Sequence, residues 1–244
     1  MNNYKITIEY EGTNFVGWQR QNNGISIQQL IEDSIKKLSN QSVTIFGAGR
    51  TDAGVHAKGQ VASFELENVL GTDTIRDGLN HYLRPYPVAI LSTEKVGVDF
   101  NARFSAKLRW YEYKVINRRA PLTFQNNRVW CVFKSIDVEK IIKQSKSFLG
   151  KKDLSAFRSI NCQSKSAIKS INSINIIQND EEISFVISAK SFLHSQVRIM
   201  VGTLIDIGTN KLSKSITEII NLKNREYAGV TAPAYGLYLK SVDY

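Results

Sequence analysis

The sequence has few of the residues that disulfide-rich and metal-binding proteins require. Its 244 residues include two cysteines, Cys131 and Cys162, which stand far apart with no second cysteine near either. This spacing excludes a dense disulfide framework and a Cys-x-x-Cys metal or redox site, so we expect both thiols to be reduced and structural. The three histidines, at 56, 81 and 194, also lack metal-ligand spacing, and we expect no catalytic metal.

Long apolar runs are missing as well. No stretch of about 18 apolar residues occurs, and the first residues, Met-Asn-Asn-Tyr-Lys, lack the apolar core of a signal peptide. We therefore expect a cytoplasmic protein that does not bind a membrane. Because 42% of the residues are hydrophobic, the chain can bury a large core, in one large domain or two.

Neither common nucleotide-binding glycine motif is complete. A Walker loop requires Lys and Ser or Thr after its second glycine, but Val55 and His56 follow Gly54. A dinucleotide fingerprint requires two residues between its second and third glycines, whereas four separate Gly49 from Gly54. These departures argue against a small-molecule nucleotide enzyme, and we expect no cofactor.

Acidic residues are scarce in the second half of the chain. Residues 1–105 carry 10 basic and 11 acidic side chains, whereas residues 106–244 carry 22 basic and 11 acidic ones, and the net charge of the chain is +10. Such asymmetry favours a polyanionic partner bound mainly by the second half, with nucleic acid as the leading candidate. A lysine-rich surface that only maintains solubility is the alternative, which charge alone does not exclude.

The order of predicted elements indicates an α+β protein with two similar halves, 1–105 and 106–244. In the first half, period-two alternation, a capping box at Ser26 and Gln29, and a cap at Asp73 predict β-α-β-β-α-β, with strands at 4–11, 43–47, 59–66 and 87–97. This is the ferredoxin-like order, which buries one face of an antiparallel sheet under helices.

The second half repeats that order, although its sequence does not repeat that of the first. We expect strands at 107–117, 171–178, 183–190 and 236–243, helices at 137–150 and 192–208, and an additional helix near 215–223. Two such antiparallel sheets can join edge to edge. A central cleft between the halves is then the natural place for a site.

The stretch Gly47-Ala-Gly-Arg-Thr-Asp-Ala-Gly-Val-His-Ala57 places one carboxylate, Asp52, among glycines and beside Arg50. Glycines allow positive φ and close backbone approach, so this connection between two strands is expected to fold sharply against a ligand. Functional residues are common on such loops. The alternative is that Asp52 only caps a turn through its own backbone.

Arg198 lies in a predicted helix, 192–208, that is apolar around much of its circumference. A buried guanidinium needs an anion, which is either a protein carboxylate or a ligand phosphate. Asp206 is about two turns away, too far for a usual pair within one helix. Asp52 is a candidate partner, and the pair would keep Asp52 ionised as a nucleophile or base. A side chain that snorkels to solvent is the alternative for Arg198.

Aromatic and charged residues interleave on the predicted strand at 107–117, where Arg109, Tyr111 and Tyr113 share one face. Aromatic faces recognise bases, and each stacked base contributes roughly 1–3 kcal/mol. The alternative is that both tyrosines are ordinary sheet residues whose hydroxyls are hydrogen-bonded.

Together these motifs resemble the bacterial tRNA pseudouridine synthase A family. The resemblance runs from about Tyr4 to Asp243, with no departure at a motif position, and rests on the glycine loop together with Gly17-Trp-Gln-Arg20, Phe104-Ser105, Arg109 with Tyr111 and Tyr113, Phe192-Leu-His-Ser-Gln-Val-Arg-Ile-Met-Val-Gly202 and Gly236-Leu-Tyr-Leu239.

The resemblance implies a pseudouridine synthase fold and a homodimeric, cofactor-independent isomerase. Its substrate would be uridine at positions 38, 39 and 40, in the anticodon stem-loop of tRNA. Asp52 resembles the catalytic aspartate, Arg198 the arginine paired with it, Tyr111 the tyrosine that packs on the target base, and Arg50 the residue that helps displace or replace the flipped base. Base flipping costs a few kcal/mol, which stacking on Arg50 and Tyr111 would offset.

Two questions stay open at this level. Asp52 can attack either the ribose or the uracil ring, and the sequence does not distinguish the two routes. A tRNA-binding chaperone without turnover is the alternative function, because it would need the same basic surface. The presence of both Asp52 and Arg198 favours the enzyme.

Overall fold

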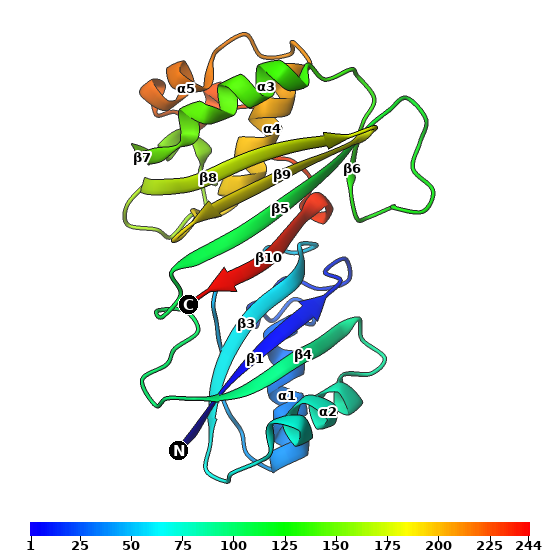
Figure 1. Ribbon diagram of the computed structural model, residues 1–244, viewed down its shortest axis with the longest axis vertical. Coiled ribbons are helices and arrows are strands. Elements are labelled where there is room, and N and C mark those ends of the chain that lie inside the picture. Colours follow the sequence, from blue (N-terminus) through cyan, green and yellow to red (C-terminus); the bar gives the residue numbers. More distant parts are fainter. The chain divides into compact units, whose positions relative to one another are not determined.

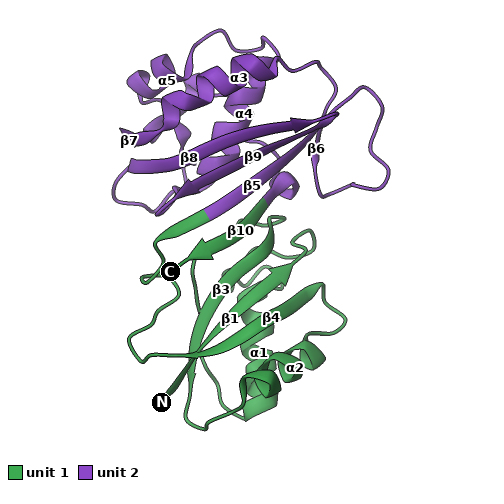
Figure 2. Ribbon diagram, viewed as in Figure 1, with its two compact units in different colours: residues 1–109, 238–244 green, residues 110–237 purple.

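The structure, a computed structural model, describes all of residues 1–244 and divides into two compact units (Figure 2). Unit 1 comprises residues 1–109 and 238–244, and unit 2 comprises residues 110–237. Both units combine helices with mostly antiparallel strands, so the fold is α+β, as predicted. The division differs from the expected one after residue 105, because the last strand is grouped with the first unit.

Unit 1 is a sheet with two helices on one face (Figure 1). Strand β1 lies between β4 and β3 and is antiparallel to both, while β2 and β10 each pair with part of β3, β2 antiparallel and β10 parallel. The elements of this unit are β1 (Asn2–Tyr10), α1 (Ile27–Ser39), β2 (Phe46–Gly47), β3 (His56–Leu66), α2 (Thr72–Leu83), β4 (Val88–Val96) and β10 (Leu237–Asp243).

The sequence explains most of these elements locally. The alternation in β1 buries Tyr4 and Tyr10 on one face. Helix α1 begins after Ser26, whose hydroxyl accepts a hydrogen bond from the Gln29 amide at 3.2 Å. The cap predicted at Asp73 is wrong: Gly71 caps α2 without a side-chain bond, and Asp73 lies within the first turn. A carboxylate there still favours the helix, because it faces the positive end of the helix dipole.

Unit 2 contains the strands β5-β9-β8-β7 in that order, with β6 parallel to β5 and with α3 and α4 on one face (Figure 1). Its elements are β5 (Leu108–Asn117), which begins in unit 1, β6 (Trp130–Val132), α3 (Val138–Ser145), β7 (Gly150–Asp153), β8 (Ile168–Asn179), β9 (Glu182–Ala189), α4 (Gln196–Gly208) and α5 (Ile216–Leu222).

Two helices of unit 2 differ from prediction. The helix expected at 137–150 ends at Ser145, and a short 3-10 turn leads to β7, where Gly150 has a φ of 85°. Helix α4 begins at Gln196 rather than at residue 192, because Ser195 has a φ of 57° and a left-handed residue cannot continue a right-handed helix. None of the helices combines the length and apolar character that a membrane crossing demands.

Candidate active site

The loop that carries Asp52 connects β2 to β3 in unit 1. Asp52 is half-buried, and its carbonyl accepts a hydrogen bond from the Val55 amide at 3.2 Å, which closes a turn. Gly54, within that turn, has a φ of 77°, a region that glycine enters without strain. The glycine thus permits the turn, and the carboxylate sits at the start of it.

Two buried side chains hold the beginning of this loop. The Arg109 guanidinium donates to the Ala48 carbonyl through Nε at 2.9 Å and Nη2 at 2.7 Å. The Gln60 amide donates to the Gly49 carbonyl at 2.8 Å. Because Arg109 and Gln60 are buried, these bonds do not compete freely with water, and they fix the path of the chain four and three residues before Asp52.

The residue next to Asp52 is held on two sides. The Thr51 hydroxyl lies 2.8 Å from the Tyr10 hydroxyl, and the Thr51 carbonyl accepts a bond from the Trp18 amide at 3.1 Å. Gly12 lets the backbone approach this loop closely, since a Cβ there would lie 2.0 Å from the Val55 carbonyl oxygen. The carboxylate of Asp52 is therefore presented by a backbone with little freedom to move.

His56 is a structural residue at the other end of the loop. It is 1% exposed, and its Nδ1 accepts a hydrogen bond from the Gly12 amide at 2.9 Å. The Glu11 carboxylate lies 3.5 Å from the same nitrogen. Arg50, by contrast, is exposed on the same loop, where its guanidinium can reach a ligand.

Helix α4 of unit 2 carries Arg198 in its first turn. Every residue of α4 is buried except Arg198, which is half-buried, so the prediction of a buried guanidinium on this helix is wrong. The Arg198 side chain donates through Nε to the Ala232 carbonyl at 2.8 Å, and the Ala232 amide donates to the Arg198 carbonyl at 3.1 Å. The first bond orients the guanidinium, and the second holds the backbone at Ala232 against α4.

The segment that contains Ala232 is packed directly on α4. A Cβ on Gly202 would lie 1.9 Å from the Val230 carbonyl oxygen, so only glycine allows this approach. The Val230 amide donates to the Asp206 carboxylate at 2.9 Å, and Asp206 is almost fully buried. Asp206 therefore supports the segment that orients Arg198, although it is too far along the helix to pair with Arg198 as a neighbour.

Tyr111 and Tyr113 lie on β5, and both are buried. The Tyr111 ring meets the Phe192 ring edge-on at 5.2 Å, which fixes its plane. The Tyr113 hydroxyl donates to the Pro233 carbonyl at 2.8 Å. Burial raises the pKa of Tyr113 well above its usual range, and the nearby charge of Arg198 opposes this increase. Tyr113 is thus the hydrogen-bonded sheet residue of our alternative interpretation, since it stays protonated beside the segment that holds Arg198.

The predicted site residues fall in both units. Arg50 and Asp52 lie together on one loop of unit 1, and Tyr111 and Arg198 lie in unit 2. The pairing of Asp52 with Arg198 joins residues of different units and stays a prediction. Sequence reasoning missed Tyr10 and Gln60 as supports of the loop and left Arg109 with no such role, and it did not identify Asp206 as a support for Arg198.

The side chains that could bind a metal ion or form a disulfide are dispersed in the structure. No cluster of three His, Cys, Asp or Glu side chains is placed to coordinate a metal ion. Cys131 and Cys162 are free thiols, both half-buried. Asp52 offers a carboxylate in unit 1, and unit 2 offers the oriented guanidinium of Arg198 and the ring of Tyr111.

Residues 6–105 and 145–244 match the model of the tRNA pseudouridine synthase family. The match covers most of the chain and includes the Asp52 loop and helix α4. The chain therefore belongs to this family, as its motifs predicted.

Relatives named tRNA pseudouridine synthase A are similar to this chain over its whole length. The protein from Ehrlichia chaffeensis is 51% identical over 243 residues, which cover 99% of each chain. The protein from Wolbachia pipientis is 49% identical with the same coverage, and the protein from Parvibaculum lavamentivorans is 46% identical over 245 residues and 100% of each chain. Similarity of this extent leaves no large domain of these relatives unmatched.

Proposed function

We propose that this protein isomerises uridine to pseudouridine in tRNA, at positions 38, 39 and 40 of the anticodon stem-loop. The observation that carries the proposal is about 50% identity over the full chain to proteins named for this activity, together with an intact Asp52 loop. The concentration of positive charge in the second half fits a polyanionic substrate. In the same proposal the protein acts in the cytoplasm as a homodimer.

Asp52 is the proposed nucleophile. The target base leaves the helical stack, and the carboxylate attacks either the ribose or the uracil ring. The bond from the ribose to the uracil nitrogen breaks, the base rotates, a bond from the ribose to a ring carbon forms, and the bond to the Asp52 carboxylate breaks to release the enzyme. The carbon loses a proton and the nitrogen gains one, so substrate and product are isomers and the balance needs no cofactor.

The other three residues support that step. Arg198 is the proposed partner of the Asp52 carboxylate, and its bond to Ala232 fixes the direction of the guanidinium. Tyr111, held edge-on by Phe192, packs on the flipped base. Arg50, exposed beside Asp52, helps displace or replace that base in the stem.

The test is to incubate the protein, without cofactor, with a uridine-containing tRNA transcript and to map pseudouridine. Asp52→Ala and the isosteric Asp52→Asn should lower product formation by at least about 1000-fold. The backbone carbonyl of Asp52, which closes the turn with the Val55 amide, is kept in both variants, and thermal melting checks that they stay folded. A parent protein that binds the transcript and forms no pseudouridine would be the non-catalytic chaperone, and unchanged activity of Asp52→Asn would reject Asp52 as the nucleophile.

A further inference from the structure

The loop between β5 and β6, residues 118–129, carries an aromatic side chain that the protein leaves uncovered. Phe124 is 96% exposed. Arg119 and Arg128 lie on either side of it in the sequence, and both are exposed. No acidic residue occurs between Glu112 and Asp137. The loop therefore carries an exposed aromatic ring between two exposed arginines in the sequence, with no carboxylate in the same stretch of chain.

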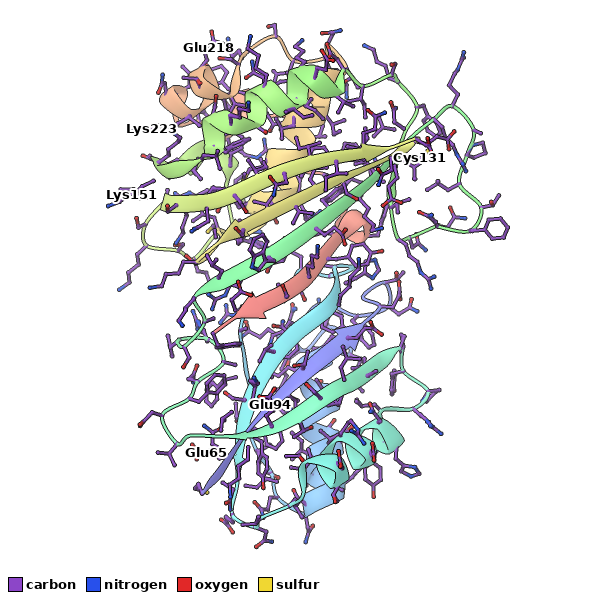
Figure 3. All side chains as sticks on the ribbon, viewed as in Figure 1. Glu65, Glu94, Cys131, Lys151, Glu218 and Lys223 are labelled. Carbon is purple, nitrogen blue, oxygen red and sulfur yellow. The ribbon has the colours of Figure 1, made fainter.

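The base of this loop is fixed, although its tip is open. The Arg118 guanidinium donates to the carbonyls of Ala120 and Pro121, at 3.2 and 3.1 Å, and to the Glu181 carboxylate at 3.1 Å. Figure 3 shows Cys131 on β6, where the loop returns to the sheet. Figure 1 shows the loop standing away from the sheet of unit 2. A loop held in this way loses less conformational entropy when its tip binds a partner.

The charge of unit 2 identifies the kind of partner. Residues 110–237 contain 19 Lys and Arg but only 10 Asp and Glu, a net charge of +9. A second copy of this loop would bring equal charges together, which costs free energy. A polyanion with exposed aromatic faces suits both the positive charge and the exposed Phe124 ring. Guanidinium groups bind its phosphates, and the aromatic ring stacks on its bases. Unpaired nucleotides of RNA have this chemistry.

We propose that loop 118–129 is a second RNA-binding element, separate from the residues that act on the target uridine. Phe124 stacks on an unpaired base of the tRNA, and Arg119 and Arg128 bind neighbouring phosphates. The proposal rests on the proposed function for the identity of the RNA. Its independent support is the exposed Phe124 ring, the arginines on either side of it in the sequence, and the hydrogen bonds of Arg118 that hold the start of the loop.

Binding of a fluorescent, full-length tRNA transcript tests the stacking contact. All variants carry Asp52→Ala, so that no turnover disturbs the equilibrium. Phe124→Ala should raise the Kd by roughly 5- to 150-fold, the loss expected for one stacked base, and Phe124→Trp should keep the affinity of the parent. Val69→Ala is the matched control, because Val69 is 69% exposed between acidic residues and should not contact RNA.

A salt series tests the two guanidinium groups. The double variant Arg119→Gln with Arg128→Gln should make the slope of log Kd against log salt concentration less steep by about 1.5, because each lost phosphate contact removes roughly 0.7 to 0.9. An unchanged slope would overturn the assignment of these arginines to phosphates.

The remaining outcomes separate this proposal from its alternatives. A Kd for Phe124→Ala within twofold of the parent would overturn the stacking contact. Sedimentation of Phe124→Ala as a monomer, where the parent is a dimer, would show that the loop binds a second copy of the chain instead. If the parent with intact Asp52 forms no pseudouridine but Phe124→Ala still weakens binding, the proposed function fails and the RNA-binding loop stands.

Discussion

The two units fix their charged groups in different ways. In unit 1, Asp52 lies on a loop whose carbonyls and hydroxyl are held by Tyr10, Gln60 and Arg109. In unit 2, Arg198 lies on a helix that is buried on all sides and is oriented by backbone contacts to Ala232. The first arrangement depends on polar side chains and the second on packing. The two should therefore fail under different substitutions, and glycine is the feature that they share.

The largest effect should come from the glycines at which backbone meets backbone. Gly202→Ala places a Cβ 1.9 Å from the Val230 carbonyl oxygen, and Gly12→Ala places one 2.0 Å from that of Val55. Neither contact can relax without a backbone shift, so each variant should lose about 3 kcal/mol or more of stability. Chemical denaturation measures this loss. Gly97→Ala is the control, since a Cβ there meets nothing within 4 Å, and its stability should change by less than about 0.5 kcal/mol.

The next largest effect concerns Arg198, and it tests whether the direction of the guanidinium matters for activity in addition to its charge. Arg198→Lys keeps the charge but loses the bond from Nε to the Ala232 carbonyl, because lysine has no guanidinium fork. We expect kcat/KM for tRNA to fall by about 10- to 100-fold, with a smaller change in melting temperature. If the lysine variant reacts as fast as the parent, charge alone is sufficient and the bond to Ala232 has no catalytic consequence.

The smallest effect comes from Tyr10, and it tests whether the hydrogen bonds of the loop matter for activity. Tyr10→Phe removes the partner of the buried Thr51 hydroxyl and should cost about 1 to 2 kcal/mol of stability. Activity should fall by about 2- to 5-fold, because Thr51 precedes Asp52. Tyr4→Phe is a matched control on the same strand, since the Tyr4 hydroxyl bonds only to Leu70, far along the chain from the loop. Equal activity losses in both variants would show that the effect is general destabilisation.

Periodicity and caps predicted much of the fold, and the exceptions have local causes. Alternation located β1, and Ser26 began α1 as expected. The start of α4 was missed because apolar spacing continues back to Phe192, whereas the left-handed Ser195 interrupts the helix. A single residue with positive φ leaves no mark on a hydrophobic pattern. The cap at Gly71 was missed for a related reason, since glycine offers no side chain to recognise as a cap.

The candidate site was only partly predictable. Asp52 stands out because it lies in a glycine-rich loop beside Arg50, and Arg198 because it is a charged residue in a largely apolar helix. The supports of the loop were missed because their partners are backbone carbonyls or hydroxyls distant in sequence. One signal was available: the alternation of β1 places Tyr10 in the core, and a buried tyrosine hydroxyl needs a partner. The sequence does not say which group that partner is.

Strand β10 makes unit 1 discontinuous in the chain. Its register with β3 pairs Tyr238 with His56, and the final residue, Tyr244, packs on Phe100 and donates to the Ala102 carbonyl at 2.9 Å. These contacts close unit 1 with residues that are translated after the whole of unit 2. The loop that carries Asp52 therefore gains the neighbouring strand β10 only after residues 237–243 have been translated.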